Sequence, residues 1–223
     1  MNRLGRVHFG LASKYKGSDV ETLYSQAVNY FHDLLKLQPK NFKVLSQVGE
    51  IYYHISMHKK DKEAENLLQA AIEKYQGTLK IKPDYSRAIM LWGNSLFRLA
   101  TLQSGDAAED LYNQVEKKYS QALKIHPNDA TALSNFGSIL LKRASNEDLD
   151  KAGPLLNKAV NSFHAVIEIK ENSPEALNLM GEALIAQAKS KRTINAHPLL
   201  AEAKGVQQNA EEYQPSAGCY NIA

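Results

Sequence analysis

The chain of 223 residues contains a single cysteine, Cys219, and no apolar stretch that approaches 18 residues. One cysteine cannot form an internal disulfide, and we identify no secretory signal segment, so disulfide scaffolds are excluded and an intracellular, cytoplasmic location is expected, with an organelle left open. The lack of a long apolar run predicts that no helix spans a membrane. A hydrophobic content of 43% with 23% charged residues indicates a globular protein rather than a disordered one.

Strong charge bias is also missing, because 27 basic and 24 acidic residues leave a formal charge of only +3. Such a balance does not indicate nucleic acid. The sequence has no glycine-rich phosphate loop, nucleophile elbow or paired-cysteine site. His54 and His58 lie one helical turn apart, but a metal ion needs a third ligand and none is evident. We therefore predict no catalytic residue, no metal and no cofactor, and hence no enzyme.

What the sequence does contain is internal repetition. One glycine recurs every 44 residues, and a small residue with an aromatic residue four places later recurs at the same period. The glycines are Gly5, Gly49, Gly93, Gly137 and Gly181; the small residues are Ala27, Ala71, Val115, Ala159 and Ala203; the aromatic residues are Phe31, Tyr75, Tyr119 and Phe163, with Gln207 breaking the series. The chain is therefore about five copies of one unit.

Each unit reads as a helical hairpin. Apolar residues fall at helical spacing around the glycine, a polar loop follows, and a second amphipathic run comes next. Prolines such as Pro39, Pro83 and Pro127 stop the second helix, since proline lacks the backbone N–H and disfavours helical geometry in the residue before it. No strand-like alternation of useful length is present, so the predicted fold is all-α.

The order of these residues resembles the tetratricopeptide repeat. In one unit the pattern is carried by Leu45, Val48, Gly49, Tyr52, Ala71, Tyr75 and Pro83, and the other units repeat it. The resemblance implies a right-handed superhelical solenoid of antiparallel helix hairpins over residues 1–223 as a single domain. Its units are expected at about 1–41, 42–85, 86–129, 130–173 and 174–217, with 218–223 beginning a further, truncated repeat.

The period departs from the family, whose usual repeat has 34 residues. Ten residues are added between the glycine of the first helix and the small residue of the second. Shared equally, they would lengthen each helix by roughly 7 Å. HEAT and armadillo repeats have periods near 44, but the glycine at a close helix contact and the closing proline favour the tetratricopeptide interpretation.

In this family, consecutive first helices line a concave groove. Carrying its groove positions onto this sequence gives a predicted partner-binding set of Arg6, Lys43, Glu50, Tyr53, Arg87, Asn94, Phe97, Asn135, Ser138, Asn178 and Glu182. Arg6, Lys43 and Arg87 lie early along this surface, while Glu175 and Glu182 lie late, so a partner of opposite polarity would be steered into register.

The resemblance implies a scaffold that binds a peptide or helix of a protein partner. Members that clamp the carboxylate of chaperone tails use two asparagines, matched here by Asn94 and Asn135, together with cations. Met90, Glu175 and Leu179 stand where the cations would be, so no chaperone tail is expected to bind. Two alternatives stay open: RNA binding, which acidic groove positions make unfavourable, and head-to-tail self-association through the ends of the stack. No membrane partner is expected.

Overall fold

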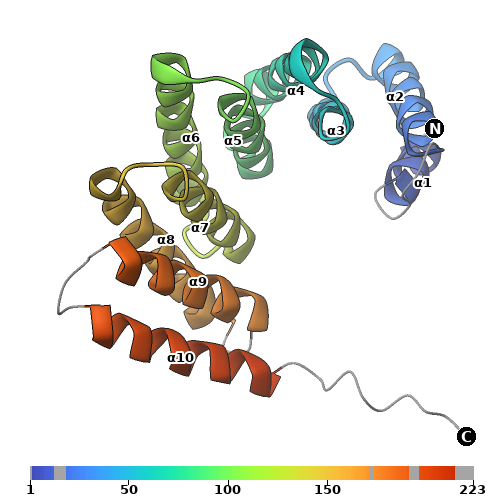
Figure 1. Cartoon of the computed structure of the whole chain (residues 1–223). Helices are drawn as coiled ribbons and strands as arrows, with labels where there is room; N and C mark the ends of the chain where they lie inside the picture. Colours follow the sequence, from blue (N-terminus) through green and yellow to red (C-terminus); the bar gives the residue numbers. More distant parts are fainter. Residues whose placement is uncertain (1, 13–18, 171–172, 191–195, 214–223) are drawn as a thin grey trace, which may run out of the picture. The chain divides into compact units, whose positions relative to one another are not determined.

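The computed structural model describes residues 2–12, 19–170, 173–190 and 196–213, and every regular element in these ranges is an α-helix (Figure 1). Ten helices are described: α1 Asn2–Ala12, α2 Asp19–Leu37, α3 Phe42–Ser56, α4 Asp61–Ile81, α5 Ser86–Ala100, α6 Gly105–Ile125, α7 Ala130–Ala144, α8 Leu149–Ile169, α9 Pro174–Ser190 and α10 Ala196–Tyr213. The predicted all-α class is confirmed.

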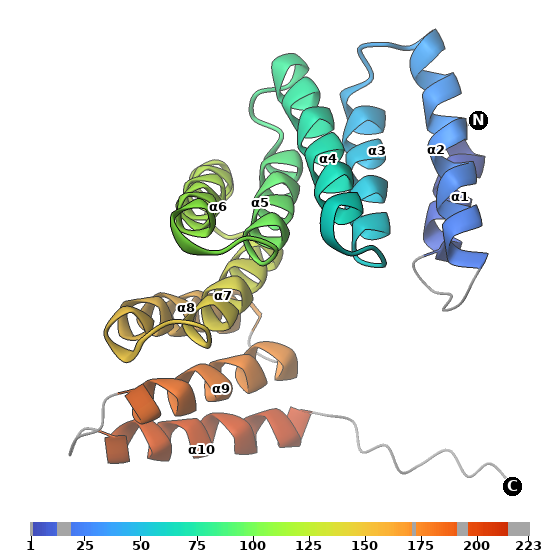
Figure 2. The same ribbon diagram turned by 45° about the horizontal axis from the view of Figure 1, so that its top comes forward.

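The helices pair in chain order into antiparallel hairpins, α1 with α2 and so on to α9 with α10 (Figure 2). They form two compact units, which we call the N-terminal unit (residues 1–125, α1–α6) and the C-terminal unit (residues 126–223, α7–α10). Within each unit the hairpins stack on their neighbours in the tetratricopeptide manner. The grouping of the whole chain as one domain stays a prediction.

The helices follow the predicted period. The first helices α3, α5, α7 and α9 begin at residues 42, 86, 130 and 174, and the second helices α4, α6 and α8 begin at 61, 105 and 149, each 44 residues after the last. The starting residue of each of these hairpins is therefore the one that the glycine count predicts.

An equal lengthening of both helices is wrong. The first helices α3, α5 and α7 have 15 residues each, whereas α4, α6 and α8 have 21. At 1.5 Å per residue the second helix is longer by about 9 Å. The second helix is the longer one because its additional turn packs against the rest of the repeat. That turn carries a buried alanine at the same place in each repeat, namely Ala64, Ala108 and Ala152. The extra length thus adds apolar contact on one helix only.

The residue before each first helix occupies one repeat position, held by Asn41, Tyr85, Asp129 and Ser173. Asn41 Oδ1 accepts a hydrogen bond from the Val44 amide, and Asp129 Oδ1 accepts from two amides of the first turn of α7. These side chains satisfy N–H groups that have no partner inside the helix. Tyr85 makes no such bond, and its ring instead packs edge-on against Phe42 with centroids 5.1 Å apart.

The recurring glycines lie where two helices of a hairpin touch. A Cβ atom placed on Gly49 would lie 2.7 Å from the Tyr75 ring, and one on Gly137 would lie 2.7 Å from the Phe163 ring. Contacts this short do not occur between real side chains, so only glycine permits the observed approach. The aromatic partner is fully buried in both cases. The same contact between a glycine and an aromatic ring is thus present in both units.

Each unit has its own apolar core. In the N-terminal unit, Phe31 and Ile51 are fully buried in one cluster, and Tyr75 anchors a second cluster that Trp92 joins. Lys118 Nζ lies 3.4 Å from the centroid of the Trp92 ring, so this tryptophan packs between helices and is covered by a cation. The C-terminal unit is centred on Phe163. These cores hold the first helices in place, and with them the residues of the predicted groove.

Candidate partner-binding site

A pocket of about 620 Å³ opens between the three first helices of the N-terminal unit. Its lining comes from one helix of each of three successive hairpins, α1, α3 and α5, together with the residues that precede α3 and α5. The lining residues are Arg6, Phe9, Gly10, Asn41, Lys43, Val44, Ser46, Gln47, Glu50, Tyr85 and Arg87. Four predicted groove residues, Arg6, Lys43, Glu50 and Arg87, are thus brought together here.

An ion pair links two walls of this pocket. Arg87 Nη2 on α5 donates to Glu50 Oε1 on α3 at 2.8 Å. Glu50 is only 8% exposed, whereas more than half of the Arg87 side chain is open to solvent. A buried carboxylate is costly without a partner, so Arg87 stabilises Glu50 and fixes the spacing of the two helices. The guanidinium still presents donors toward solvent, since only one of its nitrogens is used in this bond.

Ser46 is a polar residue in the lining that is 2% exposed, and its hydroxyl oxygen has no hydrogen-bond partner among the residues that the structure describes. Such a group is uncommon in a protein interior and calls for an explanation. Arg6 and Lys43 are exposed at the same pocket, and neither pairs with a carboxylate within the described ranges. The pocket therefore combines unpaired cations with a hydroxyl that can still donate.

Three other predicted residues of the N-terminal unit do not line this pocket. Tyr53 is half-buried against the cluster of Tyr75, where burial raises the pKa of its hydroxyl and the charge of Arg98 opposes that change. Asn94 Oδ1 accepts a hydrogen bond from the Tyr119 hydroxyl. The Phe97 ring contacts Tyr112 with centroids 6.0 Å apart. These side chains are engaged between helices, and their part in binding stays a prediction.

In the C-terminal unit the predicted residues lie on α7 and α9. Asn135 and Ser138 are half-buried on α7, and the Ser138 hydroxyl donates to the Ser134 carbonyl at 2.9 Å. Asn178 is half-buried on α9, and Glu182 one turn later is exposed. Half-buried apolar side chains of the two helices accompany them, namely Leu141, Leu179 and Ile185. We call this set, with the exposed Glu175, the α7/α9 surface.

Sequence reasoning missed Asn41, Tyr85 and Phe9 as lining residues. Asn41 and Tyr85 precede the helices that carry Lys43 and Arg87, and they hold equivalent places in their repeats. Both follow a proline of the repeat by two residues, so the closing proline was the signal that could have located them. Phe9 lies 44 residues before Tyr53 and 88 before Phe97, so the repeat period itself was the signal that could have located it.

Of the two histidines noted in the sequence, His54 is part of an aromatic cluster. His54 stacks on Tyr24 with centroids 6.1 Å apart and contacts Phe9 at 5.5 Å. Burial lowers the pKa of His54, the charge of Glu50 raises it, and the neighbouring His58 lowers it further. Within the described part of the chain, no group of three His, Cys, Asp or Glu residues could hold a metal ion.

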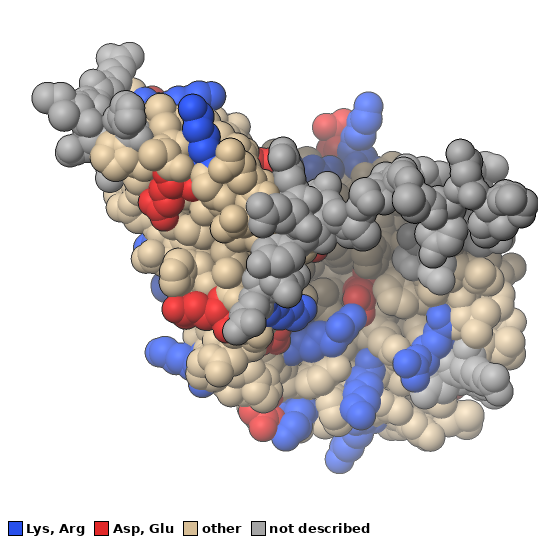
Figure 3. Space-filling model, turned by 90° about the horizontal axis from the view of Figure 1, so that it is seen from below, with Lys and Arg blue, Asp and Glu red and all other residues tan. Residues whose placement is uncertain are grey.

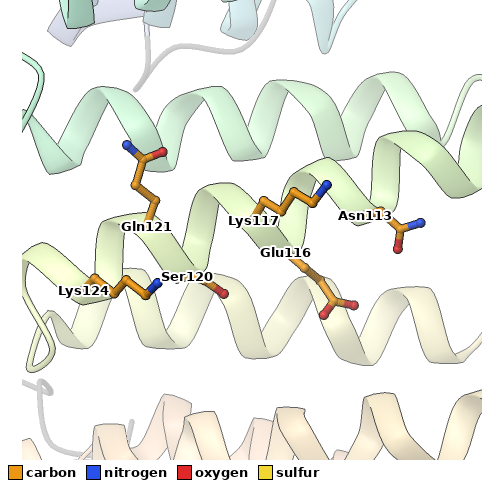
Figure 4. A pocket seen from close by; sticks show the side chains of 6 residues that line it. All are labelled: Asn113, Glu116, Lys117, Ser120, Gln121 and Lys124. Atoms are coloured by element: carbon orange, nitrogen blue, oxygen red, sulfur yellow. The ribbon is translucent and has the colours of Figure 1, made fainter.

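Two further surface features bear on the choice of ligand. A shallow hollow along α6 is lined by six polar side chains of that helix alone, and the described part of the chain supplies no second element to enclose a ligand there (Figure 4). On the face shown in Figure 3, several Lys and Arg side chains gather over the lower middle of the view, and Asp and Glu side chains lie beside them. Neither feature resembles a built nucleic-acid site.

The described helices include none with the length and hydrophobicity needed to span a bilayer. No curated protein sequence gives a significant match to the chain.

Solved structures give the fold. MamA matches with a TM-score of 0.59 and 17% identity over 100% of this chain and 98% of its own. A thermophilic tetratricopeptide-repeat protein of Thermus thermophilus matches with a TM-score of 0.60 and 16% identity over 91% and 96%. YrrB is described as a tetratricopeptide-repeat protein with an unusual peptide-binding site. It matches with a TM-score of 0.52 and 15% sequence identity over 92% of this chain and 89% of its own. The chain has the tetratricopeptide-repeat solenoid fold, as the resemblance implied.

The sequence also matches the model of one protein family, which indicates a relationship in addition to a shared fold. Its description is the plant-specific mitochondrial import receptor subunit TOM20, and it matches residues 108–223. The matched region begins in α6 and includes α7 to α10 with the whole α7/α9 surface, but not the pocket of the N-terminal unit. Because the match covers just over half of the sequence, this chain belongs to the plant-specific TOM20 import-receptor family.

Proposed function

We propose that this chain is a receptor-type scaffold, not an enzyme, and that it binds a segment of a protein partner on the first helices of its hairpins. The family match and the tetratricopeptide-repeat fold both support a protein-interaction role. The observation that carries the proposal is the α7/α9 surface, because it lies within the family-matched region and combines half-buried apolar side chains with exposed acids.

The chemistry of α9 indicates the kind of segment. Glu175, Leu179 and Glu182 are spaced by four and three residues, so they share one face of the helix. Both glutamates are exposed, while Leu179 is half-buried against the core. An amphipathic helix with arginines beside its apolar face fits such a surface, with apolar contacts in the middle and ion pairs at the edge.

Mitochondrial transit segments have this composition, since they are amphipathic, rich in arginine and poor in acids. The family description names an import receptor. We therefore propose that the partners are precursors bound for mitochondria, and that the chain works where precursors are captured, at the mitochondrial surface. A cytoplasm-facing receptor would agree with the cytoplasmic location expected from the sequence.

Self-association is a second candidate, favoured by one observation. Leu4, Val7 and Leu11 on α1 are 49%, 47% and 38% exposed and lie three and four residues apart, which places them on one face of the helix. An apolar stripe at the end of a stack can receive another copy of the chain. The proposed receptor role does not require it.

The proposal is tested with a labelled, 18-residue amphipathic peptide containing four arginines, and with a peptide of the same composition in scrambled order. We expect wild-type protein to bind the amphipathic peptide about tenfold more tightly, measured by fluorescence anisotropy. Glu175→Gln with Glu182→Gln should weaken that binding about three- to tenfold, because each exposed ion pair contributes up to about 1 kcal/mol.

Glu202→Gln is the matched control, since Glu202 is an exposed acid of the same unit that lies on α10 and is not one of the α7/α9 surface residues. Equal binding of ordered and scrambled peptides, or equal losses with the control and the test variants, would remove the receptor proposal for this surface.

A further inference from the structure

The pocket of the N-terminal unit lies outside the family-matched residues and has a different charge. Arg6, Lys43 and Arg87 supply three cations to its lining, and Glu50 is the lone carboxylate among the lining residues. Glu50 is already paired with Arg87, whose Nη2 lies 2.8 Å from Glu50 Oε1. No other carboxylate in the lining is left to compensate the charges of Arg6 and Lys43. A pocket with this excess attracts an anionic ligand and opposes the arginine-rich segment proposed for α7 and α9.

Ser46 provides an independent indication of a ligand. The side chain is 2% exposed and belongs to the pocket lining, yet its hydroxyl has no partner in the described structure. Leaving a buried hydroxyl unsatisfied costs roughly 1–3 kcal/mol. A ligand with an acceptor oxygen would relieve that cost on binding. The Ser46 hydroxyl would therefore strengthen binding without stabilising the free protein.

The remaining polar groups match a polypeptide. Gln47 ends in an amide that offers both a donor and an acceptor, which is the pair of groups that a peptide unit presents, whereas the Asn41 amide is engaged with Val44 and Gln38. Glu50 adds a carboxylate that can accept a backbone N–H. A phosphate backbone has no N–H group that could donate to this carboxylate. The volume of about 620 Å³ is within the usual range for ligand pockets and is sufficient for a few residues of an extended chain.

We propose that the pocket between α1, α3 and α5 binds an acidic, extended segment of another protein. Its carboxylates would pair with Arg6, Lys43 and the free side of Arg87, and a backbone carbonyl would accept from Ser46 Oγ. This site is separate from the α7/α9 surface, so the chain would hold two segments of opposite charge. The inference stands or fails independently of the receptor proposal.

The experiment uses the full chain and a fluorescent ten-residue peptide in which Glu alternates with Ser. Both ends of the peptide are blocked, so that no terminal carboxylate contributes. The comparison probes are the same peptide with Gln or Lys in place of Glu, and a ten-nucleotide oligouridine. We expect the Glu peptide to bind at least tenfold more tightly than the Gln peptide, and the Lys peptide to show no binding.

Arg6→Gln and Lys43→Gln should each weaken binding of the Glu peptide about three- to fivefold, and the double variant more than tenfold. Lys80→Gln is the control, because Lys80 is an exposed cation of α4 in the same unit that does not line the pocket. It should leave binding within twofold of wild type.

Ser46→Ala separates binding from folding. Because the hydroxyl has no partner in the free protein, its removal should leave the Tm unchanged or slightly raised, while the Glu peptide binds about three- to fivefold more weakly. A merely structural serine would instead lower the Tm without changing affinity.

Three results would overturn the proposal: equal binding of the Glu and Gln peptides, losses with Arg6→Gln and Lys43→Gln no larger than with Lys80→Gln, or tighter binding of oligouridine than of the Glu peptide. If the Glu peptide fails while the arginine-rich peptide still depends on Glu182, only the pocket assignment is lost. If the Glu peptide binds and depends on Arg6 and Lys43 while the arginine-rich peptide fails to bind, only the receptor proposal is lost.

Discussion

The two units are built alike but carry opposite charge. Residues 1–125 contain 18 basic and 13 acidic residues, a net charge of +5, whereas residues 126–223 contain 9 basic and 11 acidic, a net charge of −2. A Cβ atom added at Gly49 in the N-terminal unit or at Gly137 in the C-terminal unit would lie 2.7 Å from the facing aromatic ring in both cases.

What differs lies on the first helices. The N-terminal unit places Arg6, Lys43 and Arg87 around a pocket, and the C-terminal unit places Glu175 and Glu182 beside half-buried leucines. Core positions in a repeat are set by packing against the next helix, but surface positions are not. One hairpin can therefore be reused with different charges, and the two halves of a chain can bind chemically different partners.

The largest expected effect tests whether the two units depend on the same packing. Gly49→Leu in the N-terminal unit and Gly137→Leu in the C-terminal unit should each unfold the unit that contains the change, because the side chain would enter the Tyr75 or Phe163 ring. Alanine at either position should lower the free energy of unfolding by about 1–3 kcal/mol. Thermal unfolding followed by circular dichroism measures both.

Matched controls come from glycines that touch nothing. A Cβ atom at Gly77 or Gly205 would have no neighbour within 4 Å, so Gly77→Ala and Gly205→Ala should stabilise their helices by up to about 1 kcal/mol. An unchanged melting temperature for Gly49→Leu or Gly137→Leu would contradict the packing described above.

The next effect concerns the ion pair between α3 and α5 in the N-terminal unit. Arg87→Gln should destabilise the N-terminal unit by about 1–3 kcal/mol, because the Glu50 carboxylate would stay buried without its partner. Adding Glu50→Gln should recover much of that loss, since a neutral amide is cheaper to bury than a lone charge. Urea denaturation of the two single variants and the double variant measures the coupling. Purely additive losses would show that the pair does not stabilise α3 against α5.

The fold was largely predictable from the sequence, because its strongest signals are local. The spacing of Gly93 and Tyr119 within one repeat fixes which helix faces touch, and this spacing recurs. The division of the ten additional residues was not predictable. They lie between these two markers, and only the burial of Ala64, Ala108 and Ala152 shows that they extend the second helix.

The sequence was enough to predict which face of each first helix carries the candidate site. It was not enough to predict which contacts the side chains on that face make. Register on the first helices placed Arg6, Lys43 and Glu50 on one face, and all three line one pocket, while their part in binding stays a prediction. Register cannot tell whether a side chain at such a position turns to solvent or inward. Asn94 bonds Tyr119, a residue 25 positions later in the sequence, and that bond depends on the rotamer that the packed hairpin allows.

The smallest expected effect is a difference in pH sensitivity between the units. Burial lowers the pKa of His54 in the N-terminal unit, partly opposed by Glu50 and assisted by His58, while Tyr24, Tyr53 and Phe9 supply the packed rings. The folded state therefore favours neutral imidazole, and the unfolded chain takes up a proton first as the pH falls below the ordinary value of about 6.5. Stability should be full above that pH and should decrease on acidification until the folded state is protonated as well.

His54→Phe should reduce this dependence, because phenylalanine keeps the ring contacts and cannot take up a proton. Burial also lowers the pKa of His32, with Lys74 and Lys36 adding to the effect, so a smaller dependence of the same sign should persist in the variant. In the C-terminal unit His126 and His164 are exposed, and the same substitution at His164 is the matched control. Thermal unfolding of the three proteins between pH 5 and 7.5 tests the difference, and an identical slope for wild type and His54→Phe would show that burial of this imidazole does not set the pH response.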